Sequence, residues 1–100
     1  MKSITPAELK NLIDTKTDFQ LIDVREPDEY EEVNIKGHHI PMGEALERAH
    51  EISKDKQVVV HCRSGKRSAS VISVLESQLG YTNLYNLEGG IMAYLNEFGV

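Results

Sequence analysis

The stretch VVVHCRSGKRSAS, residues 58–70, decides the fold because it joins a strand, a loop and a helix in one short run. Residues 58–60 are consecutive valines, and this continuous apolar character is typical of a central parallel strand that is covered on both faces. A polar loop follows, and Gly80 supplies the expected end of the next helix. The apolar face of that helix is predicted from Ala69, Ile72, Leu75 and Leu79.

Strands and helices alternate along the rest of the chain. The predicted elements are a helix behind a capping box at residues 5–8, a buried strand at 19–24, a short acidic helix at about 27–32, a brief strand within 34–42, a helix with an apolar stripe of Leu46, Ala49 and Ile52, a strand at 84–87 and a last helix from 91 to 98. This alternation predicts an α/β fold with a parallel sheet, right-handed crossovers and helices on both faces. In such folds ligands bind outside the carboxyl ends of the strands, where Cys62 lies.

Length and composition limit the possible functions. One hundred residues suffice for one small domain, residues 1–100, and the net charge of −5 argues against a nucleic-acid surface. The N-terminus has no apolar segment of a secretion signal, and no apolar run approaches the roughly 20 residues of a membrane span. A lone cysteine cannot form an internal disulfide, which fits a reducing compartment. We therefore expect a cytoplasmic protein with no membrane segment.

The cysteine stands in an unusually basic setting for an acidic protein. Arg63, Lys66 and Arg67 follow Cys62 directly, and this local positive charge indicates a small anionic ligand. A thiol reacts as the thiolate, and a helix N-terminus, a loop curled at Gly65 and nearby cations all lower its pKa. The alternative is a small buried structural residue. A structural cysteine gains nothing from three cations, so the loop favours a reactive thiol.

Loop length separates two classes of enzyme that use such a cysteine. Cysteine phosphatases place an arginine after five intervening residues, and it binds the phosphate oxygens as a fork. Here that position is Ser68, and the loop ends one residue earlier at Arg67. A smaller loop suits attack on sulfur better than enclosure of a tetrahedral phosphate, so a phosphatase or arsenate reductase is the weaker interpretation.

Three segments together resemble the rhodanese family of sulfurtransferases. Residues 62–67, CRSGKR, match the family's six-residue active loop. Residues 21–25 with Glu29-Tyr30 resemble its first signature, and residues 87–91 with Tyr94 resemble its C-terminal one, where tryptophan is more usual than Tyr94. Residues 33–41 depart from the family's usual pattern. The resemblance implies a single rhodanese-like domain with a five-stranded parallel sheet flanked by helices.

The resemblance also implies a mechanism. Cys62 would be the catalytic residue and take sulfur from thiosulfate or a similar donor as a persulfide. The acceptor would be a thiol, such as a thioredoxin-like or other protein thiol, or cyanide. Substrate would be bound by the loop residues Arg63, Ser64, Gly65, Lys66 and Arg67, with Lys66 and Arg67 recruiting the dianionic donor. No cofactor or metal is expected. The alternative function is a persulfide carrier, or sulfur-relay binding module, that depends on a partner enzyme.

Other polar residues invite functional interpretations that we weigh against simpler ones. His61 adjoins Cys62, but neighbours on a strand point to opposite faces, which disfavours a role as its base. The adjacent His38 and His39 rarely chelate one ion without distant ligands. Asp23 and Arg25, expected as supporting residues at a strand end, could contact substrate, but an ion pair or loop-bracing hydrogen bonds are favoured.

Overall fold

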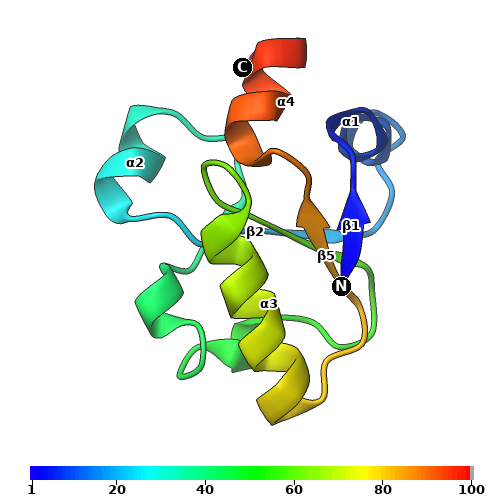
Figure 1. The fold of residues 1–100 in the computed structure, drawn as a ribbon. Helices are drawn as coiled ribbons and strands as arrows, with labels where there is room; N and C mark the ends of the chain where they lie inside the picture. The colour runs from blue at the N-terminus through cyan, green and yellow to red at the C-terminus, as the bar shows by residue number, and fades with distance from the viewer. Residues whose placement is uncertain (100) are drawn as a thin grey trace.

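The computed structural model describes residues 1–99, which form one five-stranded sheet flanked by helices (Figure 1). The strands are β1 (Lys2–Ile4), β2 (Gln20–Asp23), β3 (His38–His39), β4 (Val58–His61) and β5 (Leu84–Leu87). All neighbouring strands are parallel, and their order is β1-β5-β4-β2-β3. The helices are α1 (Pro6–Asp14), α2 (Pro27–Glu32), α3 (Lys66–Leu79) and α4 (Gly90–Phe98). The predicted five-stranded parallel α/β fold is confirmed.

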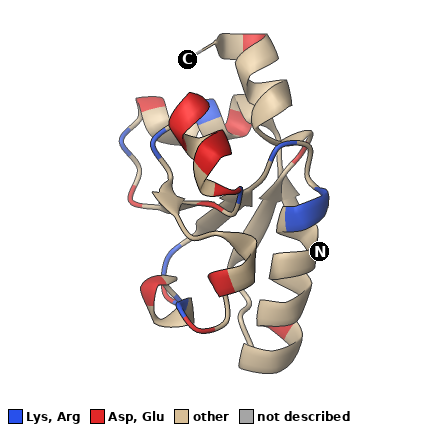
Figure 2. Cartoon of the chain, turned by 90° about the vertical axis from the view of Figure 1, so that its left-hand side faces the viewer, with Lys and Arg blue, Asp and Glu red and all other residues tan. Residues whose placement is uncertain are grey.

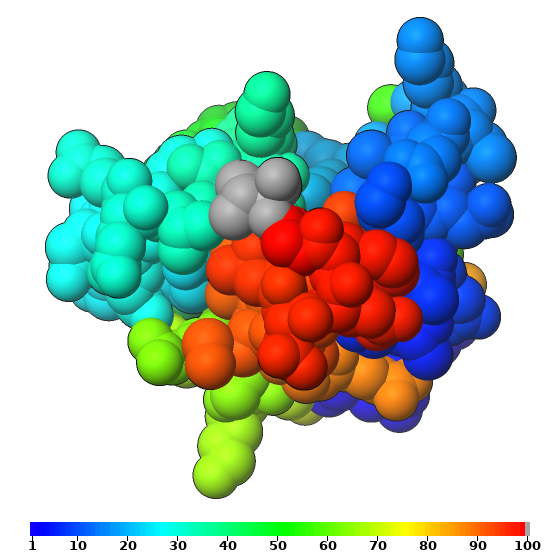
Figure 3. Space-filling view, turned by 90° about the horizontal axis from the view of Figure 1, so that it is seen from above, coloured from blue at the N-terminus to red at the C-terminus, as the bar shows by residue number. Residues whose placement is uncertain are grey.

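Each face of the sheet carries its own apolar layer, which explains why β4 reads as uninterrupted valine. Val58 and Val60 belong to the layer under α3, whereas Val59 belongs to the opposite layer with Leu9 of α1 and Tyr94 of α4. Successive strand residues point to opposite faces, so both faces of the central strand need apolar side chains. All three valines are completely buried. In Figure 3, α4 lies at the surface between α1 and α2.

The helix α1 begins as its sequence predicts. The Thr5 hydroxyl accepts a hydrogen bond from the Glu8 amide at 3.1 Å, and the Glu8 carboxylate accepts one from the Thr5 amide at 2.9 Å. These reciprocal bonds satisfy two amides that the helix leaves without partners. Caps of this kind stabilise a helix by about 1 kcal/mol.

The prediction of a helix around residues 46–52 is wrong. The structure has two short 3-10 turns there, η1 (Met42–Glu44) and η2 (Ala49–Glu51). Side chains from elsewhere bind the carbonyls of this segment: the Tyr81 hydroxyl donates to Ala49 and Ile52, each at 2.9 Å, and the Gln20 amide donates to Glu51 at 2.7 Å. These tertiary bonds replace a regular helical pattern while Ala49 and Ile52 still reach the core.

The topology brings the ends of two central strands together. Asp23, the last residue of β2, pairs in register with His61, the last residue of β4. The segments that leave these strands therefore emerge side by side at the carboxyl edge of the sheet, with Cys62 in one and Arg25 in the other.

Among the described helices, none combines the length and the apolar composition that a membrane crossing requires.

Candidate active site

Cys62 lies directly after β4, and a tight loop turns from it into α3. Cys62 is only 1% exposed, and its sulfur accepts hydrogen bonds from the Gly65 amide at 3.1 Å and the Ser68 amide at 3.4 Å. The Ser68 hydroxyl oxygen lies 3.4 Å from the same sulfur. Gly65 has a φ of +112°, a conformation that side chains disfavour and that turns its amide inward. The loop thus collects donors around one sulfur atom, as an anion-binding site requires.

This arrangement favours the thiolate. Burial raises the pKa of the Cys62 thiol, but hydrogen bonds from the Ser68 hydroxyl and from the amides of Ser68, Gly65 and Ser64 outweigh it, so the pKa lies below its ordinary value. A lowered pKa gives a larger fraction of nucleophile near neutral pH. The reactive-thiol interpretation of the sequence therefore has a physical basis in the loop.

The helix α4 holds the outer side of the same loop. The Ile91 amide donates to the Cys62 carbonyl at 2.9 Å, and the Met92 amide donates to the Arg63 carbonyl at 3.1 Å. This close approach requires a glycine at position 90, because a Cβ there would overlap the Arg63 carbonyl and lie 2.7 Å from the Ser64 amide nitrogen. Gly90 also has a φ of +62°. Gly90 of the C-terminal motif therefore allows α4 to approach the loop.

The loop cation Arg67 is bound by a carboxylate. Its guanidinium donates two hydrogen bonds to Glu29 of α2, at 2.7 and 3.0 Å. These bonds lower the pKa of Glu29 to about 2. Figure 2 shows the basic first turn of α3 and the acidic α2. Recruitment of an anionic sulfur donor by Arg67 remains a prediction. It requires the guanidinium either to release Glu29 and bind the sulfur donor instead or to bind both.

Two other loop cations, Arg63 and Lys66, are exposed. Arg63 borders a hollow of about 170 Å³ between α2 and α4, which is also lined by Glu29 and Met92. Lys66 opens α3. Donor binding by these two residues likewise remains a prediction. Their exposure leaves both charges accessible to an anion in solution.

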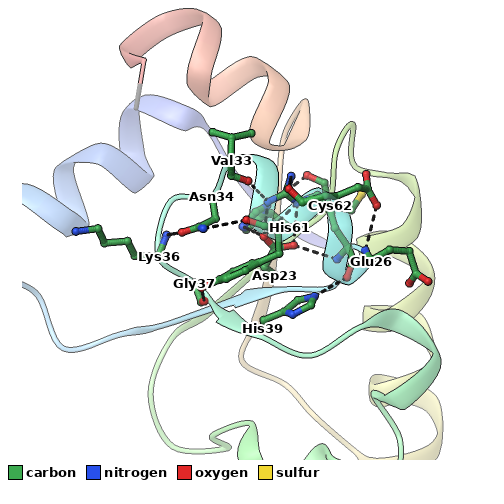
Figure 4. Close-up of polar contacts among 12 residues, drawn as sticks. Asp23, Glu26, Val33, Asn34, Lys36, Gly37, His39, His61 and Cys62 are labelled. Atoms are coloured by element: carbon green, nitrogen blue, oxygen red, sulfur yellow. Dashed lines mark hydrogen bonds and ion pairs between the residues drawn. The ribbon is translucent and has the colours of Figure 1, made fainter.

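Asp23 and Arg25 form a buried ion pair with its shortest contact at 2.7 Å. They are 0% and 3% exposed. The Arg25 guanidinium also donates to the carbonyls of Glu29 and Val33 at 3.3 and 2.8 Å, and thereby fixes α2 and the residue after it. The favoured ion pair and loop-bracing bonds are both present (Figure 4). Through Glu29, this bracing reaches Arg67 and the Cys62 loop.

His61 faces Asp23 rather than the sulfur (Figure 4). Its Nε2 lies 3.6 Å from an Asp23 carboxylate oxygen, and its Nδ1 lies 3.3 Å from the Cys62 carbonyl oxygen. Burial lowers the pKa of His61 although the charge of Asp23 opposes this shift. His61 is therefore a neutral, completely buried side chain with no hydrogen bond to the sulfur. This placement agrees with the sequence argument against a catalytic base.

His38 and His39 make separate contacts. Nε2 of His39 lies 2.7 Å from the Arg25 carbonyl oxygen and its ring stacks on Tyr30, whereas His38 pairs with Glu51 at 2.6 Å. Within residues 1–99, no group of three or more metal-ligating side chains comes together. The two histidines thus have structural partners at the edge of the sheet.

Sequence reasoning missed two residues of the site, one in contact with the sulfur and one behind it. It treated Ser68 only as the absence of a phosphatase arginine, yet Ser68 is completely buried and contacts Cys62. Asn86 was not considered, but it lies on β5 next to β4 and bonds both Ser68 and Gly65. An asparagine within the otherwise apolar strand Leu84–Leu87, at its carboxyl end, was the available signal.

Comparisons with known proteins agree with this geometry. The family model of the rhodanese-like domain matches residues 5–97. The Bacillus subtilis protein YtwF, provisionally named a sulfurtransferase, is 42% identical over 98 residues, which cover 97% of this chain and 93% of YtwF. A protein of Allochromatium vinosum named Sulfurtransferase is 41% identical over 86 residues, which cover 85% of this chain and 78% of that protein.

A solved structure gives the same result. The rhodanese-related protein of Thermoplasma volcanium superposes with a TM-score of 0.83 at 34% identity, covering 98% of this chain and 94% of that one. The family match spans the signature containing Asp23, Arg25 and Glu29, the Cys62 loop and the Gly89-Gly90 pair. The chain therefore belongs to the family of rhodanese-like domains.

Proposed function

We propose that this protein is a thiosulfate-type sulfurtransferase that carries sulfur on Cys62 as a persulfide. The arrangement of three donors around the Cys62 sulfur carries the proposal: the amides of Gly65 and Ser68 and the Ser68 hydroxyl all lie within 3.4 Å. Donors at this position stabilise the attacking thiolate and the same thiolate when it leaves. Membership of the rhodanese-like family and the relatives named as sulfurtransferases support the same reaction class.

The proposed reaction has two balanced halves. In the first, the Cys62 thiolate attacks the outer sulfur of thiosulfate, a new S–S bond forms, the S–S bond of thiosulfate breaks, and sulfite leaves with the electron pair. In the second, an acceptor thiolate attacks the outer sulfur of the Cys62 persulfide, and Cys62 leaves as the thiolate. Cyanide replaces the acceptor in the test tube and gives thiocyanate. The protein returns to its starting state without an external oxidant or reductant.

The exposed cations Arg63 and Lys66 support an anionic donor. The protein carries a net charge of −5, so thiosulfate is repelled at long range and needs local positive charge at the loop. We propose that Lys66 supplies this charge, and that Arg67 joins it after exchanging part of its contact with Glu29. The acceptor is a small thiol or a protein thiol, because no second cysteine exists in the chain.

Intact-mass spectrometry tests the proposal. The reduced protein is incubated with thiosulfate, and a gain of about 32 Da, one sulfur atom, is expected. The gain should be absent in Cys62→Ser and disappear from the native protein when a thiol is added. Thiocyanate formation in steady state with cyanide then measures turnover. Failure to gain sulfur from thiosulfate would reject this donor.

A second candidate function is a persulfide carrier that depends on a partner enzyme. A Bacillus subtilis relative, YrkF, provisionally named a sulfur carrier, is 34% identical over 83 residues, although the chain spans only 44% of its length. A carrier accepts a persulfide but turns over poorly with thiosulfate and a small thiol. Loading from a persulfidated protein without steady-state turnover would favour the carrier over the enzyme.

A further inference from the structure

The hydroxyl of Ser68 has more acceptors than protons. Its oxygen lies 3.4 Å from the Cys62 sulfur, 3.2 Å from the Gly65 carbonyl oxygen and 2.5 Å from Oδ1 of Asn86. A hydroxyl has a single proton to donate, so these acceptors compete for it. Ser68 is completely buried, so solvent is not available to relieve the competition.

Asn86 is held so that its oxygen faces Ser68. Its side-chain nitrogen donates to the Gly65 carbonyl at 3.1 Å, and this bond defines which end of the amide is the donor. The Gly65 carbonyl also accepts from the Ala69 amide at 3.2 Å. With two donors already bound, Gly65 needs the Ser68 proton least. The effective choice for the hydroxyl is between the sulfur and Asn86.

The charge on the Cys62 sulfur changes during the proposed reaction, and this decides the choice. The thiolate carries a full negative charge and is a strong acceptor. In the persulfide the charge has moved to the outer sulfur, and the inner sulfur, now bonded twice, is a weak acceptor. The same charge returns to the inner sulfur when the acceptor takes the outer one.

We propose that Ser68 is a catalytic residue whose hydroxyl donates to Cys62 in the thiolate and turns to Asn86 in the persulfide. Asn86 is the positioning residue that provides the alternative acceptor. This inference rests on the proposed sulfur transfer and adds residues to it. The hydroxyl assists both halves, because Cys62 is a thiolate as the nucleophile of the first half and as the leaving group of the second.

Alkylation by iodoacetamide across a range of pH tests whether Ser68 donates to the Cys62 thiolate, and it needs no sulfur donor. Ser68→Ala should move the midpoint of Cys62 alkylation upward by about one pH unit, because a hydrogen bond to a charged group is lost. The matched control is Ser70→Ala, the same substitution at an exposed position of α3. Ser68→Thr keeps the hydroxyl and should restore the midpoint. The nearby ionisable groups, Arg67 with its partner Glu29 and the neutral, buried His61, are the same in every variant.

Asn86→Ala separates the proposal from a structural role. If the hydroxyl only turns to Asn86 in the persulfide, the thiolate keeps its donor and the alkylation midpoint does not rise. If Asn86 and Ser68 merely support the loop, both alanine variants raise the midpoint, and the proposal is overturned. A wild-type midpoint in folded Ser68→Ala would overturn it as well. Should Ser68→Ala fail to fold, Ser68→Thr and Asn86→Ala still decide between the two outcomes.

Single-turnover transfer tests whether Ser68 assists Cys62 as the leaving group of the second half-reaction. Protein preloaded with persulfide is mixed with dithiothreitol, and the release of the Cys62 thiolate should be about tenfold slower in Ser68→Ala than in Ser70→Ala. Equal rates would overturn the leaving-group role. If the protein accepts no sulfur, the proposed function fails on that result alone, whereas the alkylation profiles still report on Ser68.

Discussion

Arg67 and Glu29 form a two-bond ion pair that joins the Cys62 loop to α2, with N–O distances of 2.7 and 3.0 Å. The pair is partly exposed, at 33% for the Arg67 side chain and 24% for Glu29. A cation of the loop motif therefore has a carboxylate partner within the protein, and we expect this partner to compete with an anionic donor. The ion pair leads to one prediction for catalysis and one for stability in acid.

Removing the carboxylate should improve donor binding. Glu29→Gln leaves the Arg67 guanidinium available, so we expect the KM for thiosulfate to fall by about two- to fivefold, in line with the energy of a partly exposed ion pair. The control is Glu31→Gln, which removes the same charge from an exposed position of α2. Steady-state kinetics at low ionic strength measure the effect. An unchanged KM, or the same fall in both variants, would contradict competition at Arg67.

Acid should destabilise the native protein more steeply than the Glu29→Gln variant. The pKa of Glu29 falls from 4.5 to about 2 in the folded state, so between these values the unfolded chain binds a proton that the folded one does not. Its stabilisation is complete above pH 4.5 and is lost as the pH falls toward 2. Thermal unfolding across this interval measures the difference. Glu51 has a similarly lowered pKa but is present in both proteins, so parallel curves would count against Glu29.

Gly90 should not tolerate a side chain. In Gly90→Ala the new Cβ overlaps the Arg63 carbonyl and occupies a positive-φ position, so we expect a loss of about 1 to 3 kcal/mol in the free energy of unfolding. Sulfur transfer should fall with it, because the amides of α4 no longer reach the loop. Urea denaturation is the measurement. Gly43→Ala is the control, since a Cβ there meets nothing within 4 Å, and equal losses in the two variants would refute the steric argument.

The buried pair of Asp23 and Arg25 should contribute far more to stability than a surface pair. Arg25→Met leaves the completely buried Asp23 carboxylate without its partner, and we expect a loss of about 3 to 5 kcal/mol. The comparison is Lys10→Met, which breaks an exposed pair with Asp14 on α1 and should cost about 0.5 kcal/mol or less. Urea denaturation of both variants at pH 7 measures this difference. A small loss for Arg25→Met would show that water or another cation reaches Asp23.

The sequence predicted those parts of the fold in which one local pattern decides the structure. Strand β4 and helix α3 follow from an unbroken valine run, apolar spacing and Gly80, whose φ of +71° fits the predicted helix end. Strand β1 was not predicted, because Lys2 and Ser3 are exposed and the strand has no apolar pattern of its own. It exists because its backbone pairs with β5 at the edge of the sheet.

The site shows the same division between local and distant information. The cysteine and its loop could be recognised because their donors are neighbours in the chain. The bond from Ser68 to Asn86 and the ion pair from Arg67 to Glu29 span 18 and 38 residues, and no local pattern specifies such partners. Motif matching placed Glu29 within a signature but gave it no role.

The attachment of α4 to the loop has a consequence for the order in which the protein forms. The Cys62 and Arg63 carbonyls bind amides at positions 91 and 92, and β1 near the start of the chain pairs with β5 near its end. During synthesis, neither contact is available until residues 84–92 have left the ribosome. A nascent chain therefore lacks the α4 side of the Cys62 loop until the last helix has been made, whereas the donors to the Cys62 sulfur at residues 65–68 are available earlier.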